Sequence, residues 1–119
     1  MGCFEVTLRI ANPVSPGRAS TMQLLVDTGA TLTSLPRPVL ESLGITPGMS
    51  RTFRIADGRR VRRDTGTVLA TLDAVTMAVP VMFAEGDDAP VLGATALEIL
   101  GFAVDPVEKK LVPRDLLAL

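Results

Sequence analysis

The sequence has no histidine, tryptophan or tyrosine, and its only aromatic side chains are four phenylalanines among 119 residues. The missing histidine excludes a Ser-His-Asp triad, a Cys-His pair, a histidine general base and nearly all zinc sites. We expect no metal and no cofactor. A core has to be built from Val, Leu, Ile, Ala and Met.

Cysteine and long apolar runs are also scarce. Cys3 is the single cysteine, which forbids a disulfide within the chain and is typical of a reducing compartment. The first residues lack the basic segment and apolar run of a secretory signal, and no apolar stretch reaches the ~18 residues of a membrane span. The net charge of −1 provides no field to attract nucleic acid or an anionic membrane. We expect a soluble cytoplasmic protein whose partners include neither.

The residues that are present favour a folded chain. Hydrophobic residues make up 47% of the sequence, which excludes a disordered chain and suffices for a core without disulfides or a structural metal. The length predicts one domain over residues 1–119.

Apolar patterning predicts a mainly β chain with one or two short helices. Residues 4–10 alternate in polarity, whereas residues 22–26 are nearly all apolar and are predicted to be buried on both faces. Asp57-Gly58 is a hairpin turn signal between two β-rich segments. The predicted strands are 4–10, 22–26, 33–35, 52–56, 59–63, 67–72, 76–83, 91–93, 102–104 and 110–112, and the predicted helices are 38–43 and 94–100.

One motif points to chemistry. Asp27-Thr28-Gly29 directly follows the apolar segment Leu24-Leu25-Val26. A carboxylate at the end of an apolar strand is costly unless a partner or a reaction uses it. The glycine permits a tight turn and the threonine supplies a hydroxyl that can brace the loop. The alternative is that Asp27 only opens a turn, since Asp and Gly are common turn residues.

A second motif, Val91-Leu92-Gly93, ends 66 residues after Asp27 and leads directly into the predicted helix 94–100. The ordered set of apolar strand, Asp-Thr-Gly, hairpin, apolar pair with glycine and helix resembles the retropepsin-like aspartic proteases. It is most similar to their small, single-lobe prokaryotic members. The resemblance covers nearly the whole chain and implies a closed β barrel with one short C-terminal helix, which assembles as a two-fold symmetric dimer.

The resemblance also implies the chemistry. In aspartic proteases two Asp carboxylates share one proton, because like charges so close cannot both ionise, and together they activate a water that attacks the peptide bond. It identifies Asp27 as the catalytic residue, Thr28 as a buried hydroxyl tying two active-site loops together, and Gly29 as lying beneath the substrate. Ala30 belongs to the same loop. The resemblance also assigns a flap that covers the substrate to Ile55, Ala56, Asp57 and Gly58. It assigns the support of the catalytic loop to Val91, Leu92 and Gly93.

A second Asp-Thr-Gly occurs at Asp64-Thr65-Gly66. Arg62 and Arg63 precede it in place of an apolar run, and it lies too close to the first motif to begin a second lobe. We interpret Asp64 as an exposed strand residue. The two carboxylates then have to be Asp27 from each of two chains, which implies a homodimer that hydrolyses peptide or protein substrates as an aspartic endopeptidase.

Some residues depart from the family pattern. Retroviral members usually carry Asp two residues after the first glycine and Arg or Asn after the second, whereas this chain has Thr31 and Ala94. The ion pairs that help to fix the dimer are therefore absent. The flap tip also has one glycine, Gly58, instead of several, which predicts a stiffer flap.

Two other functions remain open. The same fold could bind a peptide or partner without cleaving it. Alternatively, the basic hairpin, in which six arginines and Asp57 give residues 51–63 a charge of +5, could bind an anionic partner while Asp27 is structural. The arginines could equally keep an edge strand from aggregating, and no aromatic residue between them is available to stack on bases.

Overall fold

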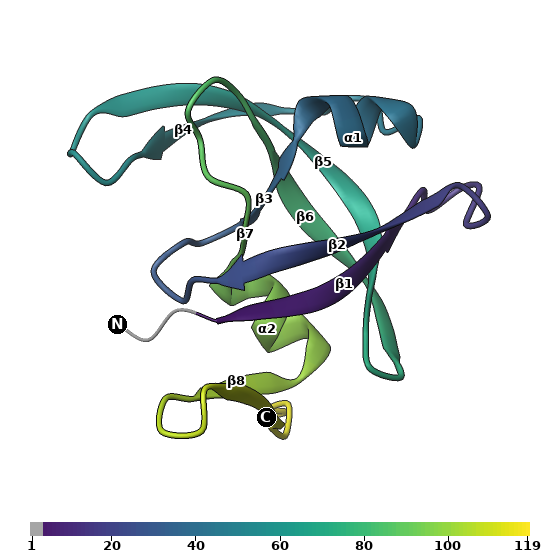
Figure 1. Ribbon diagram of the computed structural model, residues 1–119. Coiled ribbons are helices and arrows are strands. Elements are labelled where there is room, and N and C mark those ends of the chain that lie inside the picture. The colour runs from purple at the N-terminus through teal and green to yellow at the C-terminus, as the bar shows by residue number, and fades with distance from the viewer. Residues whose placement is uncertain (1–3) are drawn as a thin grey trace.

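This computed structural model describes residues 4–119, which fold into nine strands and two short helices (Figure 1). Cys3 lies outside the described residues. The first elements are β1 (Glu5–Ala11), β2 (Ala19–Val26), β3 (Thr33–Pro36) and α1 (Arg37–Ser42). They are followed by β4 (Ser50–Arg54), β5 (Arg60–Leu72), β6 (Val75–Ala84) and β7 (Val91–Leu92). The last are α2 (Ala94–Leu100), β8 (Phe102–Asp105) and β9 (Lys110–Pro113).

Six of these strands close into a barrel. Neighbouring strands follow the order β1-β2-β7-β3-β6-β5, and β5 pairs back with β1, with Arg9 opposite Thr71 and Ala11 opposite Leu69. The short strand β7 lies parallel to β2 and antiparallel to β3. The predicted mainly β fold, a closed barrel with a short C-terminal helix, is confirmed.

Aliphatic side chains and Phe83 fill the barrel, as the shortage of aromatic residues requires. Phe83, Ile10 and Leu92 are completely buried. Helix α2 lies below the barrel in Figure 1 and adds Leu97 and Leu100 to the same core. This burial of apolar area drives the fold, and it places α2 against the barrel of which β7 is part.

Strand β2 differs from its prediction in two ways. It begins at Ala19, because it pairs with β1 over its whole length up to Ala11 opposite Ala19. It is also not buried on both faces, since Gln23 is exposed while Leu24 and Val26 are buried. The prediction of two-sided burial is wrong because β2 lies in a barrel wall, with one face toward the core and one toward solvent.

Strand β5 is continuous where the sequence predicted two separate strands. Its first part pairs with β4, ending at Asp64 opposite Ser50, and its second part pairs with β6 from Thr65 opposite Met82. The β4–β5 hairpin is the predicted flap hairpin, and it extends from the barrel toward the left in Figure 1. The second Asp-Thr-Gly therefore lies inside a strand, at the point where the hairpin leaves the barrel.

The helices agree with their predictions to within one residue. Helix α1 has Pro38 in its first turn and is followed by Gly44 at φ +76°, and α2 ends at Gly101, whose φ of +82° is left-handed. Both glycines adopt a backbone conformation that other residues rarely tolerate. No helix within residues 4–119 is long and apolar enough to cross a membrane.

Candidate active site

Asp27 occupies the first position after β2, and backbone contacts from β7 fix its place. Its N–H donates to the carbonyl of Leu92 (3.0 Å), which extends the parallel β2–β7 pairing by one residue. Its own carbonyl accepts the N–H of Ala30 (3.2 Å), which closes a tight turn. Asp27 can therefore both open a turn and serve as a site residue, because the turn directs its side chain.

The carboxylate of Asp27 is half-buried and oriented through one oxygen. Oδ1 accepts the N–H of Gly29 (2.9 Å). Among residues 4–119, Oδ2 has no hydrogen-bond partner. A β-carbon at Gly29 would lie 3.2 Å from Oδ1, which explains why glycine suits this position. One oxygen of Asp27 is therefore fixed and the other is available to a reactant.

The predicted support residues do meet the Asp27 loop. The first N–H groups of α2 bond to that loop, from Ala94 to the carbonyl of Ala30 (2.8 Å) and from Thr95 to that of Thr31 (3.0 Å). A β-carbon at Gly93 would lie 2.5 Å from the carbonyl oxygen of Leu32, closer than real atoms approach. Residues 27–32 and 91–95 therefore form one rigid unit joined by backbone hydrogen bonds.

Thr33 completes this unit, although the sequence analysis did not single it out. Its side chain is only 1% exposed, and Oγ1 accepts the N–H of Gly93 at 3.0 Å. A buried N–H without a partner is costly, so this hydroxyl stabilises the turn between β7 and α2. The signal available in the sequence was a hydroxyl residue that opens the predicted strand 33–35.

Thr28 and Gly29 are exposed in the single chain. The hydroxyl of Thr28 has no hydrogen-bond partner within the described residues, whereas the family resemblance implied a buried hydroxyl. One chain alone therefore leaves the surface beside Asp27 uncovered. Burial of Thr28 would require a second molecule on this surface.

The predicted flap residues lie at the tip of the β4–β5 hairpin. Ile55 N–H donates to the carbonyl of Arg59 (2.9 Å), so Ala56, Asp57 and Gly58 form the turn, with Gly58 at φ +90°. Both N–H and Nε of Arg59 donate to Asp57, and these two bonds lower the pKa of that carboxyl. In Figure 1 the hairpin and the turn after β2 extend to the same side of the molecule.

The hairpin arginines are mostly exposed. Arg54 lies directly opposite Arg60 in the β4–β5 register, an unfavourable like-charge pair. Within residues 4–119, Arg51, Arg54, Arg60 and Arg62 form no ion pair, in contrast to Arg59 and Arg63. β4 pairs with β5 alone, so its other edge is open, and exposed charge of this kind disfavours pairing of such an edge with other chains.

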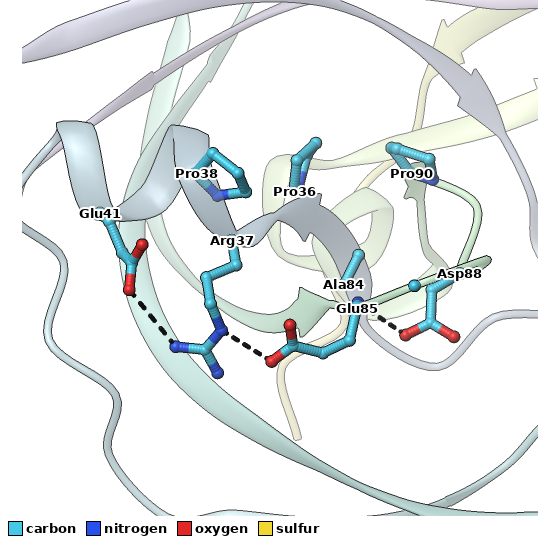
Figure 2. A pocket seen from close by; sticks show the side chains of 9 residues that line it. Pro36, Arg37, Pro38, Glu41, Ala84, Glu85, Asp88 and Pro90 are labelled. Carbon is cyan, nitrogen blue, oxygen red and sulfur yellow. Dashed lines mark hydrogen bonds and ion pairs between the residues drawn. The ribbon is translucent and has the colours of Figure 1, made fainter.

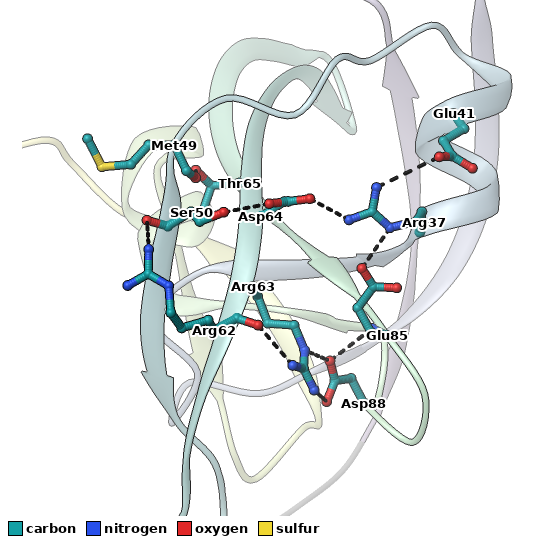
Figure 3. Close-up of polar contacts among 10 residues, drawn as sticks. All are labelled: Arg37, Glu41, Met49, Ser50, Arg62, Arg63, Asp64, Thr65, Glu85 and Asp88. Atoms are coloured by element: carbon teal, nitrogen blue, oxygen red, sulfur yellow. Dashed lines mark hydrogen bonds and ion pairs between the residues drawn. The ribbon is translucent and has the colours of Figure 1, made fainter.

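Asp64 is not the exposed residue that the sequence predicted. Its side chain is 31% exposed, and Figure 3 shows it between Ser50 and Arg37. Oδ1 accepts the hydroxyl of Ser50 (2.6 Å) and Oδ2 accepts Nη2 of Arg37 (2.6 Å). The bond from Ser50, followed by that from Arg37, lowers the pKa of Asp64. Both carboxylate oxygens of Asp64 thus accept hydrogen bonds from the chain itself, whereas only one oxygen of Asp27 does.

A surface pocket of about 480 Å³ lies beside Arg37 (Figure 2). Pro36, Pro38 and Pro90 form part of its wall. Its charged groups bond to one another, since Arg37 Nε donates to Glu85 (2.7 Å) and Glu85 N–H donates to Asp88 (2.9 Å). Within the described residues no group of three or more Asp, Glu, Cys or His side chains is placed to bind a metal ion.

Comparison with known proteins now identifies the family. The crystal structure of a retropepsin-like aspartic protease from Rickettsia conorii superposes with a TM-score of 0.57 at 21% identity, over 87% of this chain and 88% of that chain. That likeness establishes the fold. No curated protein matches the sequence. The sequence pattern of the family described as "gag-polyprotein putative aspartyl protease" matches residues 17–99. This range is more than half of the chain and includes Asp27-Thr28-Gly29 and Val91-Leu92-Gly93. This chain therefore belongs to that aspartyl protease family and has the retropepsin-like fold.

Proposed function

We propose that this protein is a homodimeric aspartic endopeptidase in which Asp27 from each of two chains activates one water. The observation that carries the proposal is the setting of Asp27. It follows a barrel strand directly, Gly29 orients one of its oxygens, and its other oxygen has no partner within residues 4–119. A structural aspartate of this chain, Asp64, has both oxygens bonded.

The reaction needs two carboxylates that share one proton. The ionised carboxylate takes a proton from the water, whose oxygen attacks the carbonyl carbon of the scissile peptide bond. The protonated carboxylate donates a hydrogen bond to the carbonyl oxygen. The tetrahedral intermediate collapses when the C–N bond breaks and the departing nitrogen takes the proton that the first carboxylate accepted from the water, which leaves the pair with one shared proton again. No covalent enzyme intermediate forms.

A second copy of the chain supplies the second carboxylate by two-fold symmetry. The exposure of Thr28 and Gly29 supports this assembly, because both flank Asp27 on an uncovered surface. The residues at the family's usual ion-pair positions, Thr31 and Ala94, contribute backbone instead, through the bonds from Thr95 to Thr31 and from Ala94 to Ala30. The loop is therefore rigid without the missing ion pairs, but the dimer gains no stability from them.

A peptide substrate would lie between the two Asp27 residues and the hairpin tips. The tip residues Ala56 and Asp57 are exposed, and within residues 4–119 their backbone carbonyls accept no hydrogen bond, so they can bond to an extended peptide, as added strands do. Specificity would then depend on side chains next to the tip, among them Ile55.

Cleavage of a peptide library between about pH 3 and pH 7, with the solution mass measured in parallel, tests the proposal. We expect a dimer that cleaves best on the acid side of neutrality and that a hydroxyl-bearing transition-state mimic blocks. A monomer at all concentrations, or cleavage that requires a metal, would contradict it. A dimer that binds peptides without cleaving them would favour the binding module on the same fold.

A further inference from the structure

The second Asp-Thr-Gly lies at the root of the hairpin. Strand β5 pairs with β4 up to Asp64 and with β6 from Thr65 onward. Bonds to the β4 side continue at Thr65, through Gly48 and Met49, where pairing with β6 begins. The hairpin therefore joins the barrel at Asp64 and Thr65, and a change in its angle relative to the barrel would be centred on them.

Arg37 connects Asp64 to the body of the protein. Its Nη2 donates to Asp64 (2.6 Å) and its Nε donates to Glu85 (2.7 Å), as Figures 2 and 3 show in part. Its guanidinium carbon lies 4.7 Å from the ring centroid of Phe83, which is completely buried. A planar guanidinium on an aromatic face with two carboxylates at its edge has one preferred position.

Arg63 anchors the opposite face of the same strand. Adjacent residues of a strand point to opposite sides, and Arg63 donates to Asp88 through Nε (2.6 Å) and Nη2 (3.2 Å). These side chains are only 20% and 13% exposed. Asp88 also accepts the N–H of Glu85 (2.9 Å), so one short loop, residues 85–88, bonds to both anchors.

The other two residues of the tripeptide also make close contacts. Thr65 bonds to the segment that leads into β4, and Gly66 packs against the barrel core. Thr65 donates its N–H to Met49 (3.0 Å) and accepts the N–H of Gly48 (2.7 Å). A β-carbon at Gly66 would lie 3.1 Å from the Phe83 ring, so the strand packs closely on the ring that also contacts Arg37. Each residue of Asp64-Thr65-Gly66 is therefore held by contacts at the junction of the hairpin and the barrel.

The same network leads to the active site. The loop of residues 85–88 continues into β7, whose Leu92 carbonyl accepts the N–H of Asp27. The hairpin root and the Asp27 turn are thus attached to the two ends of one short segment, residues 85–92.

We propose that Arg63 and Asp64 form a two-sided anchor, with Arg37 as its positioning residue, which sets the angle of the hairpin over Asp27. The link to catalysis rests on the proposed endopeptidase function, but the anchor itself does not. Losing either ion pair frees the hairpin to swing about the junction of Asp64 and Thr65 while the barrel keeps its pairing.

Spin-label distances within one chain test the anchor without any cleavage. Cys3 is replaced by serine, and labels are attached at Ala56→Cys on the hairpin tip and Ala74→Cys in the exposed turn between β5 and β6. Labelled chain is diluted with unlabelled chain, so that only distances within a chain are measured. The variants are Asp64→Asn, which keeps the size of the side chain, and Arg37→Met, which keeps its contact with Phe83.

We expect both variants to broaden the distance distribution about twofold relative to the parent, because the hairpin samples more angles. The matched control is Glu41→Gln, since Glu41 is 60% exposed and lies 3.7 Å from Arg37 without touching the hairpin. It should leave the distribution unchanged. If one variant fails to fold, the other still decides.

An unchanged distribution in a folded variant would overturn the anchor, and so would equal broadening in the control. Where cleavage is measurable, a released hairpin should raise KM more than it lowers kcat, since the Asp27 turn stays intact. If the parent protein cleaves nothing but the variants show the expected broadening, the proposed function is overturned and the anchor is supported.

Discussion

Gly93 is the residue at which one added methyl group should matter most. A β-carbon there would lie 2.5 Å from the Leu32 carbonyl and 2.9 Å from that of Ala30. Because both contacts are to backbone, Gly93→Ala has to displace the Asp27 turn. We expect a loss of about 1–3 kcal/mol in the free energy of unfolding, measured by urea denaturation.

Gly17→Ala is the matched control, because no atom lies within 4 Å of its β-carbon position. It should be neutral or slightly stabilising. Similar losses in the two variants would contradict the close packing of Gly93 behind the Asp27 turn.

Thr33 offers a second test at the residue scale. Thr33→Val keeps the shape of the side chain and leaves the Gly93 N–H buried without its partner. The expected loss is about 1–3 kcal/mol, again by urea denaturation. Thr71→Val is the control, since its hydroxyl pairs with Thr76 at an exposed position. A loss in the control as large as in Thr33→Val would refute the role of this buried bond.

The sequence located these residues unevenly. The places of Asp27, directly after a strand, and of Gly93, packed behind the Asp27 turn, could be predicted because each lies in a recognisable local pattern. Arg37 could not be predicted, since its partners Asp64 and Glu85 are distant in the chain and only the barrel brings them together. Asp64 was misassigned because its arginine neighbours suggested solvent, whereas Arg63 is itself paired with Asp88.

At the scale of elements, hairpins and helices were predicted well because turns and caps are local. The Asp57-Gly58 turn and the helix ending at Gly101 needed no distant partner. The continuity of β5 was missed, because Gly66 weakens a strand pattern locally. In the structure the close packing of Gly66 on Phe83 explains that glycine.

The hairpin anchor predicts how stability depends on pH. Hydrogen bonds from Ser50 and Arg37 lower the pKa of Asp64, and the bond from Arg63 lowers that of Asp88. The folded state therefore binds fewer protons than the unfolded state near the ordinary Asp pKa of about 3.9. The stabilisation is complete above that pH and is lost as the pH falls through the lowered values.

Asp64→Asn removes one of these contributions. The variant should be less stable than the parent at neutral pH, and its stability should decline less steeply between about pH 5 and pH 2, measured by urea denaturation. Asp87→Asn, in the exposed part of the same loop, should keep the parent's slope. A parental slope in Asp64→Asn would contradict the ionic role of Asp64.

At the scale of the whole molecule, the barrel is complete within one chain but the proposed dyad is not. Closure of β5 on β1 leaves the core covered, whereas Asp27, Thr28 and Gly29 border an uncovered surface. The fold could be predicted from one sequence because every strand finds its partner within it. Assembly depends on contacts between two surfaces, and their strength is not encoded in any local pattern.

Shared catalysis between chains predicts that the rate per chain rises with chain concentration until dimers saturate. Because Thr31 and Ala94 form no such ion pairs, we expect that transition at a higher concentration than in relatives that have them. Measured rates at fixed substrate, from nanomolar to micromolar chain, should therefore increase faster than linearly at the low end. A strictly linear dependence over the whole range would indicate an active single chain or a dimer too tight to dissociate.

The most direct test mixes parent and Asp27→Asn chains under conditions where dimers exchange freely. If each site needs one Asp27 from each chain, an equal mixture retains about 25% of the activity expected from the same total of parent chain, because only parent–parent dimers are competent. The full series should follow the square of the parent fraction, and Asp27→Asn alone should be about 100- to 10,000-fold less active. Retention of about 50%, with a linear series, or an active Asp27→Asn homodimer, would contradict a dyad formed by Asp27 from two chains.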